Sequence, residues 1–157
     1  MNMTIKQIRR WAAAVAAICL LTLFLPLYGM TAFAATARIA FSDPTASVGS
    51  EINVKMKITS SDNLSTADIM LAYDPGSLEF IEGTNAEGGN GAVRVHGDGG
   101  GANTTTLAYD LKFKASAAGT SKITVTSQEI YDASSQIVTV DKQGESQVTV
   151  SALSSAS

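Results

Sequence analysis

The sequence has few of the residues that build reactive or metal-binding sites: one cysteine, one tryptophan and one histidine among 157 residues. Cys19 and Trp11 both lie within the first 34 residues, so the rest of the chain contains neither type. Without cysteine, that part forms no disulfide bond and depends on its apolar core for stability. The single histidine, His96, has no second histidine and no EF-hand pattern to complete a zinc or calcium site. The sequence therefore predicts no metal and no cofactor.

The groups needed for catalysis are also missing. No cysteine nucleophile remains after residue 34, and the serines are scattered through turns rather than placed beside a base. The segment 87–106 holds seven of the thirteen glycines, but it lacks the Gly-Lys-Ser/Thr ending of a phosphate-binding loop. Flexible connections that flank a short strand account for it better. We expect a protein that is not an enzyme.

The start of the chain has the pattern of a secretory signal peptide. Three basic residues precede an apolar run at 11–25, and the small-residue triplet Ala-Phe-Ala follows at 32–34. A transmembrane anchor is the alternative, but the run is shorter than the roughly 20 residues that cross a bilayer. We therefore predict a signal peptide at 1–34, cleaved between Ala34 and Ala35. The product is expected to be secreted, with attachment to the cell surface left open.

Removal of this segment changes the charge of the protein. Eight basic and fourteen acidic residues remain, which gives the product a net charge of −6. Such a charge makes nucleic acid and anionic membranes poor partners. The remaining length suits one domain, which we place at 35–152, followed by a tail or the start of a linker at 153–157.

Apolar residues alternate with polar ones along nearly the whole domain, and no stretch of ten residues has helical spacing. Short alternating runs separated by glycine, serine and aspartate turns are typical of a sandwich of two β-sheets. We predict an all-β fold, a nine-stranded two-sheet β-sandwich with jelly-roll topology. The expected strands are 37–41, 51–59, 92–96, 106–116, 122–132, 136–140 and 146–152, with two more inside the unit 68–83.

The unit "DIMLAYDPGSLEFIEG" at 68–83 combines a strand, a turn and a second strand. Successive side chains of a strand point to opposite faces. Because the set that contains Asp68 carries a charge, we expect that set to face outward, together with Met70 and Ala72. The other set, which ends at Tyr73, is then expected to face the core.

The turn of this unit is expected to be structural rather than catalytic. Asp74 can accept hydrogen bonds from backbone N–H groups, and Pro75 fixes its own φ near −65°. Gly76 tolerates a positive φ at the next position.

The order of these motifs resembles that of a cohesin domain, the secreted module that binds dockerin modules in cellulosomes and related cell-surface assemblies. The matching features are the "VGS" turn at 48–50 before an alternating strand, "LSTADIMLAYDPGSLEF" at 64–80 and "LKFKASAAGTSKITV" at 111–125. The resemblance covers about residues 37–152. It implies a module for protein–protein interaction, whose partner is a dockerin-bearing protein with calcium expected on the dockerin side. The implied setting is extracellular polysaccharide degradation or cell-surface assembly.

The resemblance also implies a binding face. In cohesins, the sheet made of strands three, five, six and eight receives the dockerin. Asp68 matches a family aspartate that accepts hydrogen bonds from the dockerin. Thr66 stands where the family often has asparagine, and it lacks that amide. With Met70 and Ala72 as the apolar centre, the same outward parity on neighbouring strands adds Arg94, His96, Ala108, Asp110 and Lys112.

Two alternatives stay open at this point. A carbohydrate-binding module has a similar sandwich fold, but sugars stack on planar aromatic rings, and the mature chain has no tryptophan. Its other aromatic residues mostly have inward parity, so polysaccharide is the weaker prediction for a partner. A structural Ig-like surface sandwich without a dockerin partner is the second alternative. His96 fits either an interface or an ordinary exposed turn.

Overall fold

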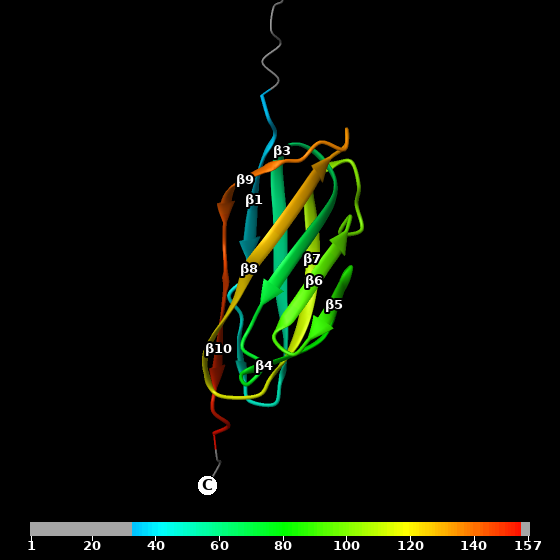
Figure 1. Ribbon diagram of the computed structural model, residues 1–157. Coiled ribbons are helices and arrows are strands. Elements are labelled where there is room, and N and C mark those ends of the chain that lie inside the picture. The colour runs from blue at the N-terminus through cyan, green and yellow to red at the C-terminus, as the bar shows by residue number, and fades with distance from the viewer. Residues whose placement is uncertain (1–32, 155–157) are drawn as a thin grey trace, which may run out of the picture. The chain divides into compact units, whose positions relative to one another are not determined.

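The computed structural model describes residues 33–154, and all regular secondary structure in this range is β-strand (Figure 1). Apart from its last two residues, the predicted signal peptide lies outside the described residues. Within residues 33–154, no helix is long and apolar enough to span a membrane. The strands are β1 (Thr36–Phe41), β2 (Thr45–Ser47), β3 (Glu51–Ala72), β4 (Leu78–Gly83), β5 (Ala86–Gly89), β6 (Ala92–Gly97), β7 (Thr104–Ala115), β8 (Gly119–Asp132), β9 (Thr139–Gln143) and β10 (Ser146–Ser151).

The long strand β3 belongs to both layers of the sandwich. Its first part, 51–59, pairs with β1 and β7, whereas its second part, 64–72, pairs with β6 and β8. The register shifts between Thr59 and Leu64, where the chain passes from one layer to the other. One layer therefore has the order β9-β1-β3-β7-β4, and the other has the order β5-β6-β3-β8-β10-β2. This confirms the predicted all-β sandwich.

The number and bounds of the strands differ from the prediction. Two strands that were expected to be separate, at 51–59 and at the start of 68–83, are continuous in β3. Strands β2 and β5 were not predicted, and β9 begins at Thr139 rather than at residue 136. The described chain thus has ten strands instead of nine.

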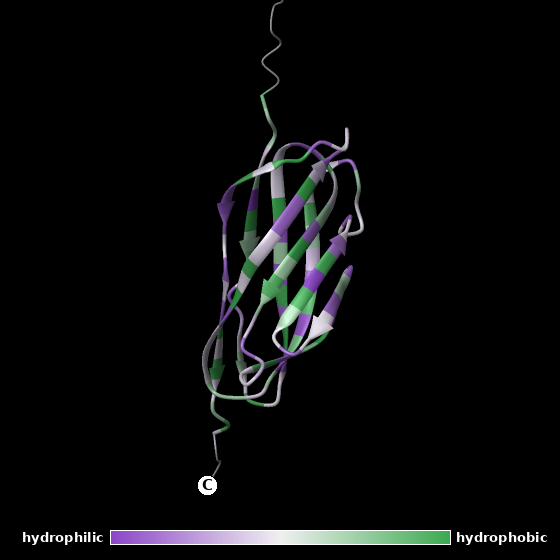
Figure 2. Ribbon diagram, viewed as in Figure 1, coloured by the Kyte–Doolittle hydropathy of each residue, from purple (hydrophilic) through white to green (hydrophobic). Residues whose placement is uncertain are grey.

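The core lies between the two layers, as the alternation predicted. Figure 2 shows hydrophobic and hydrophilic residues alternating along the strands. The inward residues of β7 are buried, with Phe113 fully enclosed. The ring of Phe113 packs edge-on against Tyr73 and Phe80, at centroid distances of 5.2 and 5.5 Å. Tyr73 is buried, and its hydroxyl accepts a hydrogen bond from the Phe80 amide.

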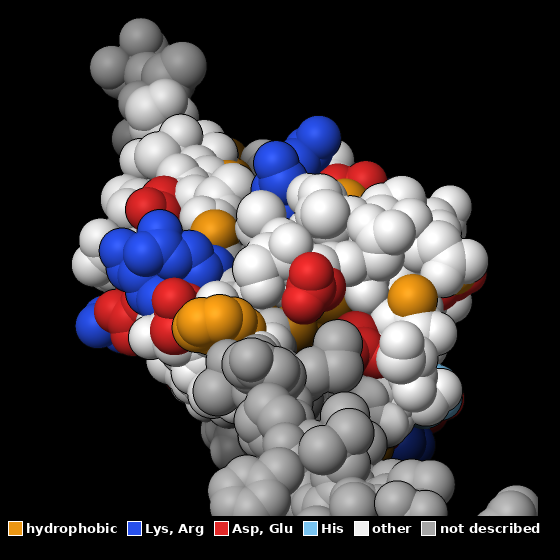
Figure 3. All heavy atoms as spheres, turned by 90° about the horizontal axis from the view of Figure 1, so that it is seen from above, with side chains coloured by type: hydrophobic (Ala, Val, Ile, Leu, Met, Phe, Trp, Pro, Cys, Tyr) orange, Lys and Arg blue, Asp and Glu red, His pale blue; other side chains and the backbone are white. Residues whose placement is uncertain are grey.

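Large hydrophobic side chains are scarce on the surface of the described residues. Only Phe33, Ile81, Ile137 and Leu153 are exposed among them. In the view of one end of the domain, hydrophobic side chains form small separate patches between charged and polar ones (Figure 3). An apolar surface therefore does not by itself mark a binding site here.

The turn after β3 has the predicted hydrogen bonds to Asp74. The carboxylate of Asp74 accepts from the Gly76 amide at 2.9 Å and from the Ser77 hydroxyl at 2.7 Å. The Ser77 amide also donates to the Asp74 carbonyl at 3.1 Å, which closes the turn. Gly76 does not have a positive φ, so the turn does not use the conformation that glycine tolerates there. A turn whose two central residues both have negative φ fits type I, which needs no glycine.

The glycine-rich segment is more ordered than predicted. Residues 86–97 form a hairpin of β5 and β6, joined by Asn90 and Gly91. These two residues have φ values of 53° and 94°, as a type I′ turn requires. The Asn-Gly pair was the sequence signal that would have predicted this hairpin.

Candidate functional site

The outer surface of the β6, β3 and β8 strands brings together most of the predicted site residues. We call this surface the Asp68 face. It consists of the outward side chains of Thr66, Asp68, Met70, Ala72, Ala92, Arg94, His96, Ser127, Glu129 and Tyr131. In the sheet, Asp68 lies between His96 of β6 and Glu129 of β8. Thr66, Met70 and Ala72 are half-buried along β3.

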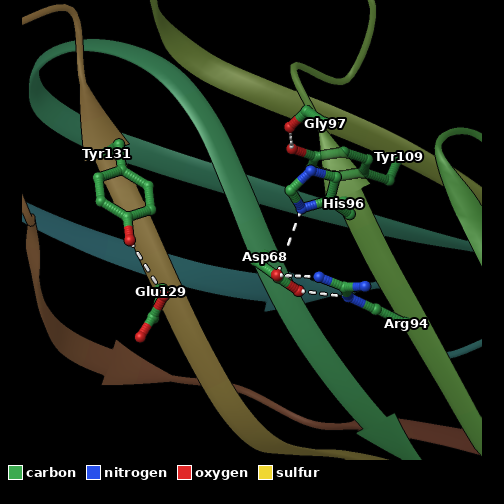
Figure 4. A network of polar contacts seen from close by, with 7 residues as sticks. All are labelled: Asp68, Arg94, His96, Gly97, Tyr109, Glu129 and Tyr131. Atoms are coloured by element: carbon green, nitrogen blue, oxygen red, sulfur yellow. Dashed lines mark hydrogen bonds and ion pairs between the residues drawn. The ribbon is translucent and has the colours of Figure 1, made fainter. Parts of the chain in front are cut away.

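A cluster of three polar side chains forms the centre of this face (Figure 4). Arg94 is paired with Met70 in the register, so its guanidinium reaches diagonally to Asp68. Arg94 Nε donates to Asp68 Oδ1 at 3.0 Å, and Nη2 donates to Oδ2 at 2.6 Å. His96 Nδ1 lies 3.3 Å from the same Oδ2. Both carboxylate oxygens are therefore occupied in the protein alone.

This pairing changes what Asp68 can offer. The hydrogen bond from Arg94 is the main reason that the pKa of Asp68 lies below its usual value, and partial burial opposes it. The same bond raises the pKa of Arg94. The side chain of Asp68 is 27% exposed, against 48% for Arg94 and 61% for His96. Arg94 and His96 therefore cover part of the Asp68 carboxylate, which stays partly exposed.

Four residues of this face were not predicted from the sequence: Ala92, Ser127, Glu129 and Tyr131. Tyr131 and Glu129 lie on β8, opposite Thr66 and Asp68. The Tyr131 hydroxyl donates to Glu129 Oε2 at 3.0 Å (Figure 4), and this bond raises the pKa of Tyr131. Strict alternation from the buried Ile123 and Val125 would turn both residues inward. The register shift between Met70 and Leu71, which pairs Met70 with Ser127 and Leu71 with Val125, instead turns them outward beside Asp68.

Arg94 of the cluster and Glu87 of β5 form a ridge on the surface, which we call the Glu87–Arg94 ridge. These two residues are paired across β5 and β6. A shallow hollow lies on each side of the ridge, and both residues line both hollows. The first hollow is completed by Met70, Gly88, Gly89, Asn90 and Ala92, and the second by Gly83, Asn85, Ala86 and His96. Glycines in β5 leave the first hollow open.

Asp110 does not belong to the Asp68 face, so its predicted place there is wrong. β7 pairs with residues 51–59 of β3 and with β4, which puts it in the other layer. The outward side chains of β7, which include Ala108 and Lys112, therefore lie on the surface of the sandwich opposite the Asp68 face. There, Asp110 lies 4.0 Å from Lys55, and Lys112 binds Glu82 at 2.7 Å.

A search of the described residues finds no group of three or more histidine, cysteine, aspartate or glutamate side chains arranged to hold a metal ion. The carboxylates of Asp68 and Glu129 instead accept hydrogen bonds from Arg94 and Tyr131.

Comparison with known proteins identifies the fold. No protein-family model and no curated protein sequence matches the chain. Among solved structures, the non-cellulosomal cohesin of Archaeoglobus fulgidus is 21% identical, with a TM-score of 0.61 over 74% of this chain and 91% of that chain. The sixth cohesin of scaffoldin B from Acetivibrio cellulolyticus, solved with a mutant dockerin, is 19% identical, with a TM-score of 0.63 over 74% and 99%.

A cohesin module from a family 33 glycoside hydrolase of Clostridium perfringens is 10% identical, with a TM-score of 0.61 over 76% of this chain and 98% of that chain. These alignments span nearly the whole length of the known modules. The chain therefore has the cohesin fold.

Proposed function

We propose that this chain is a non-catalytic, cohesin-like module that binds a dockerin-bearing protein through the Asp68 face. The observation that carries the proposal is the polar cluster of Asp68, Arg94 and His96 on a domain with the cohesin fold. Several of the solved cohesins with this fold were crystallised in complex with dockerins.

The dimensions of the face suit such a partner. With β5 counted at its edge, the face has four strands about 4.8 Å apart, and a strand of roughly five residues at about 3.3 Å each is some 15 to 20 Å long. With the surrounding loops, this area approaches the roughly 800 Å² that one partner contributes to a standard interface. Met70, Ala72 and Ala92 supply a small apolar patch beside the charged side chains of Asp68 and Arg94.

The setting follows from the predicted signal peptide. We propose that the domain works outside the cell, either free or associated with the cell surface, in polysaccharide degradation or surface assembly. Calcium is expected on the dockerin rather than on this chain. Polysaccharide remains the alternative ligand, whereas the net charge of −6 after residue 34 argues against nucleic acid.

Calorimetric titration tests the docking function. The purified protein is titrated with each dockerin module encoded in the same genome, in calcium and again after chelation. We expect at least one dockerin to bind in calcium and to lose affinity when the metal is removed. A parallel titration with soluble oligosaccharides tests the alternative. Binding of an oligosaccharide, with no dockerin bound, would overturn the proposal.

A further inference from the structure

The Asp68 face presents Arg94 to a partner more openly than it presents Asp68. Each oxygen of Asp68 already accepts a hydrogen bond from Arg94, at 3.0 and 2.6 Å. A guanidinium has five N–H donors, and these two bonds leave three of them free. About half of the Arg94 side chain is exposed, against about a quarter of Asp68. An incoming partner therefore meets N–H donors where the sequence led us to expect an acceptor.

The planar guanidinium group of Arg94 is held in a fixed orientation as well as exposed. Two parallel hydrogen bonds to one carboxylate fix the plane of a guanidinium, which a single ion pair does not do. His96 lies on the same Asp68 oxygen at 3.3 Å and limits the rotation of the carboxylate. Figure 4 shows Arg94 and His96 converging on Asp68 from the same strand. The free donors of Arg94 thus have a set direction before any partner arrives.

Glu87 supplies the matching acceptor. It is exposed, it is paired with Arg94 across β5 and β6, and it lines the same two hollows. A partner carboxylate that entered either hollow would meet Glu87, and a partner ammonium would meet Arg94. A primary amide avoids both conflicts, because it accepts through its oxygen and donates through its nitrogen.

We propose that the Glu87–Arg94 ridge determines partner specificity by binding an Asn or Gln side chain of the docked protein, and that Asp68 is a positioning residue for Arg94. This inference rests on the proposed docking function and names the chemistry that the partner must present. The apolar wall of the first hollow, at Met70 and Ala92, suits the aliphatic stem of such a side chain.

The test is a set of titrations with a dockerin that binds the unchanged protein. Arg94→Ala is expected to weaken binding about 10- to 100-fold, as for a buried arginine at an interface centre. Arg94→Lys should weaken binding nearly as much, because lysine keeps the positive charge but lacks the planar guanidinium that forms two parallel hydrogen bonds. Asp68→Ala should have a smaller effect. The double variant should bind no more weakly than Arg94→Ala alone, because Asp68 acts through Arg94.

A matched ion pair on the opposite layer provides the control. Lys112 and Glu82 form an exposed ion pair, at 2.7 Å, on β7 and β4 outside the Asp68 face. Lys112→Ala and Glu82→Ala should leave the affinity unchanged. Thermal unfolding of each variant shows that it is folded at the temperature of the titration.

Substitution on the partner side identifies the bound group. Each exposed Asn and Gln of the dockerin is replaced by alanine and combined with Arg94→Ala or Glu87→Ala in a double-mutant cycle. At least one Asn or Gln of the dockerin should show a coupling energy with Arg94 or Glu87 in this cycle. Coupling of the ridge to an acidic residue alone would overturn the inference. So would a double variant of Asp68→Ala and Arg94→Ala whose loss of affinity equals the product of the two single losses. Either result would leave the docking function intact. If no dockerin binds the unchanged protein, the docking function fails and the inference fails with it.

Discussion

At the scale of single residues, Asp74 shows how an exposed carboxylate can stabilise a fold. Its pKa is lowered, first by the hydrogen bond from the Ser77 hydroxyl and then by the bond from the Gly76 amide. A carboxyl group whose folded pKa lies below its unfolded pKa stabilises the protein above the unfolded value, near pH 4. That contribution is lost as the pH falls through the folded pKa.

Asp74→Ala should therefore lower the urea midpoint at pH 7, and the difference from the unchanged protein should shrink below about pH 4. Urea titrations monitored by circular dichroism at both pH values measure this. Asp62→Ala is the control, since Asp62 is an exposed carboxylate that accepts no hydrogen bond within the described residues. A difference that stays constant with pH would show that the turn bonds do not depend on the charge of Asp74.

Two buried serines on neighbouring strands make a second prediction at this scale. Within the described residues, the Ser121 hydroxyl is the one buried side-chain group without a hydrogen-bond partner. The Ser146 hydroxyl is also buried, and it donates to the Ser42 carbonyl at 2.6 Å. Ser121→Ala should leave the free energy of unfolding unchanged or raise it by about 1 kcal/mol.

Ser146→Ala should instead lower the free energy of unfolding by about 1 kcal/mol, because it leaves the Ser42 carbonyl without its donor. Denaturant titrations of the two variants give the comparison. Equal losses would mean that Ser121 has a partner, such as a buried water molecule.

At the scale of elements, the β5–β6 hairpin supports one side of the Asp68 face. Gly91 has a φ of 94°, and an added Cβ would lie 3.2 Å from the Tyr73 carbonyl oxygen. Gly91→Ala should therefore lower the free energy of unfolding by about 1 to 3 kcal/mol, the usual cost of such a conformation for a residue other than glycine.

Gly101→Ala is the matched control for this hairpin. Gly101 has no positive φ, and an added Cβ would meet nothing within 4 Å. Its substitution should leave the midpoint of denaturant unfolding nearly unchanged. A similar loss in both variants would point to a general effect of the glycine-rich segment rather than to the turn.

The direction of most side chains within a strand was predictable, because alternation of apolar and polar residues indicates which side chains face inward. The buried set of β7 and the outward set around Asp68 both followed from it. The joining of two predicted strands into β3 was not predictable, because the alternation breaks where the strand passes between layers. Its buried residues fall at even positions up to Leu64 and at odd positions from Ala67. The turn at Asn90 and Gly91 could have been predicted from its two residues alone.

At the scale of the whole molecule, processing of the amino terminus remains a prediction. Cleavage after Ala34 would remove Trp11, the only tryptophan of the chain. The secreted protein should therefore begin at Ala35 and show tyrosine but no tryptophan fluorescence. N-terminal sequencing and an emission spectrum of protein purified from the medium measure both. Tryptophan emission from a membrane-bound form that starts at Met1 would contradict the signal peptide.

The sequence by itself determined the fold class, the inward and outward sets of the strands that alternate without a break, and the residues of the turn at Asp74. These properties are local, because they depend on neighbours within one strand or one turn. The sequence also indicated Asp68, Arg94 and His96 as outward residues, and the structure brings them together.

Only the tertiary structure decided which outward residues share a face. Asp110 and Asp68 have the same outward parity, yet they lie on opposite layers because β7 pairs with the first part of β3 and β6 with the second. The bond between Arg94 and Asp68 depends on the register that sets Arg94 opposite Met70. Alternation fixes the side of a strand that a residue occupies, but pairing between distant segments selects its neighbours.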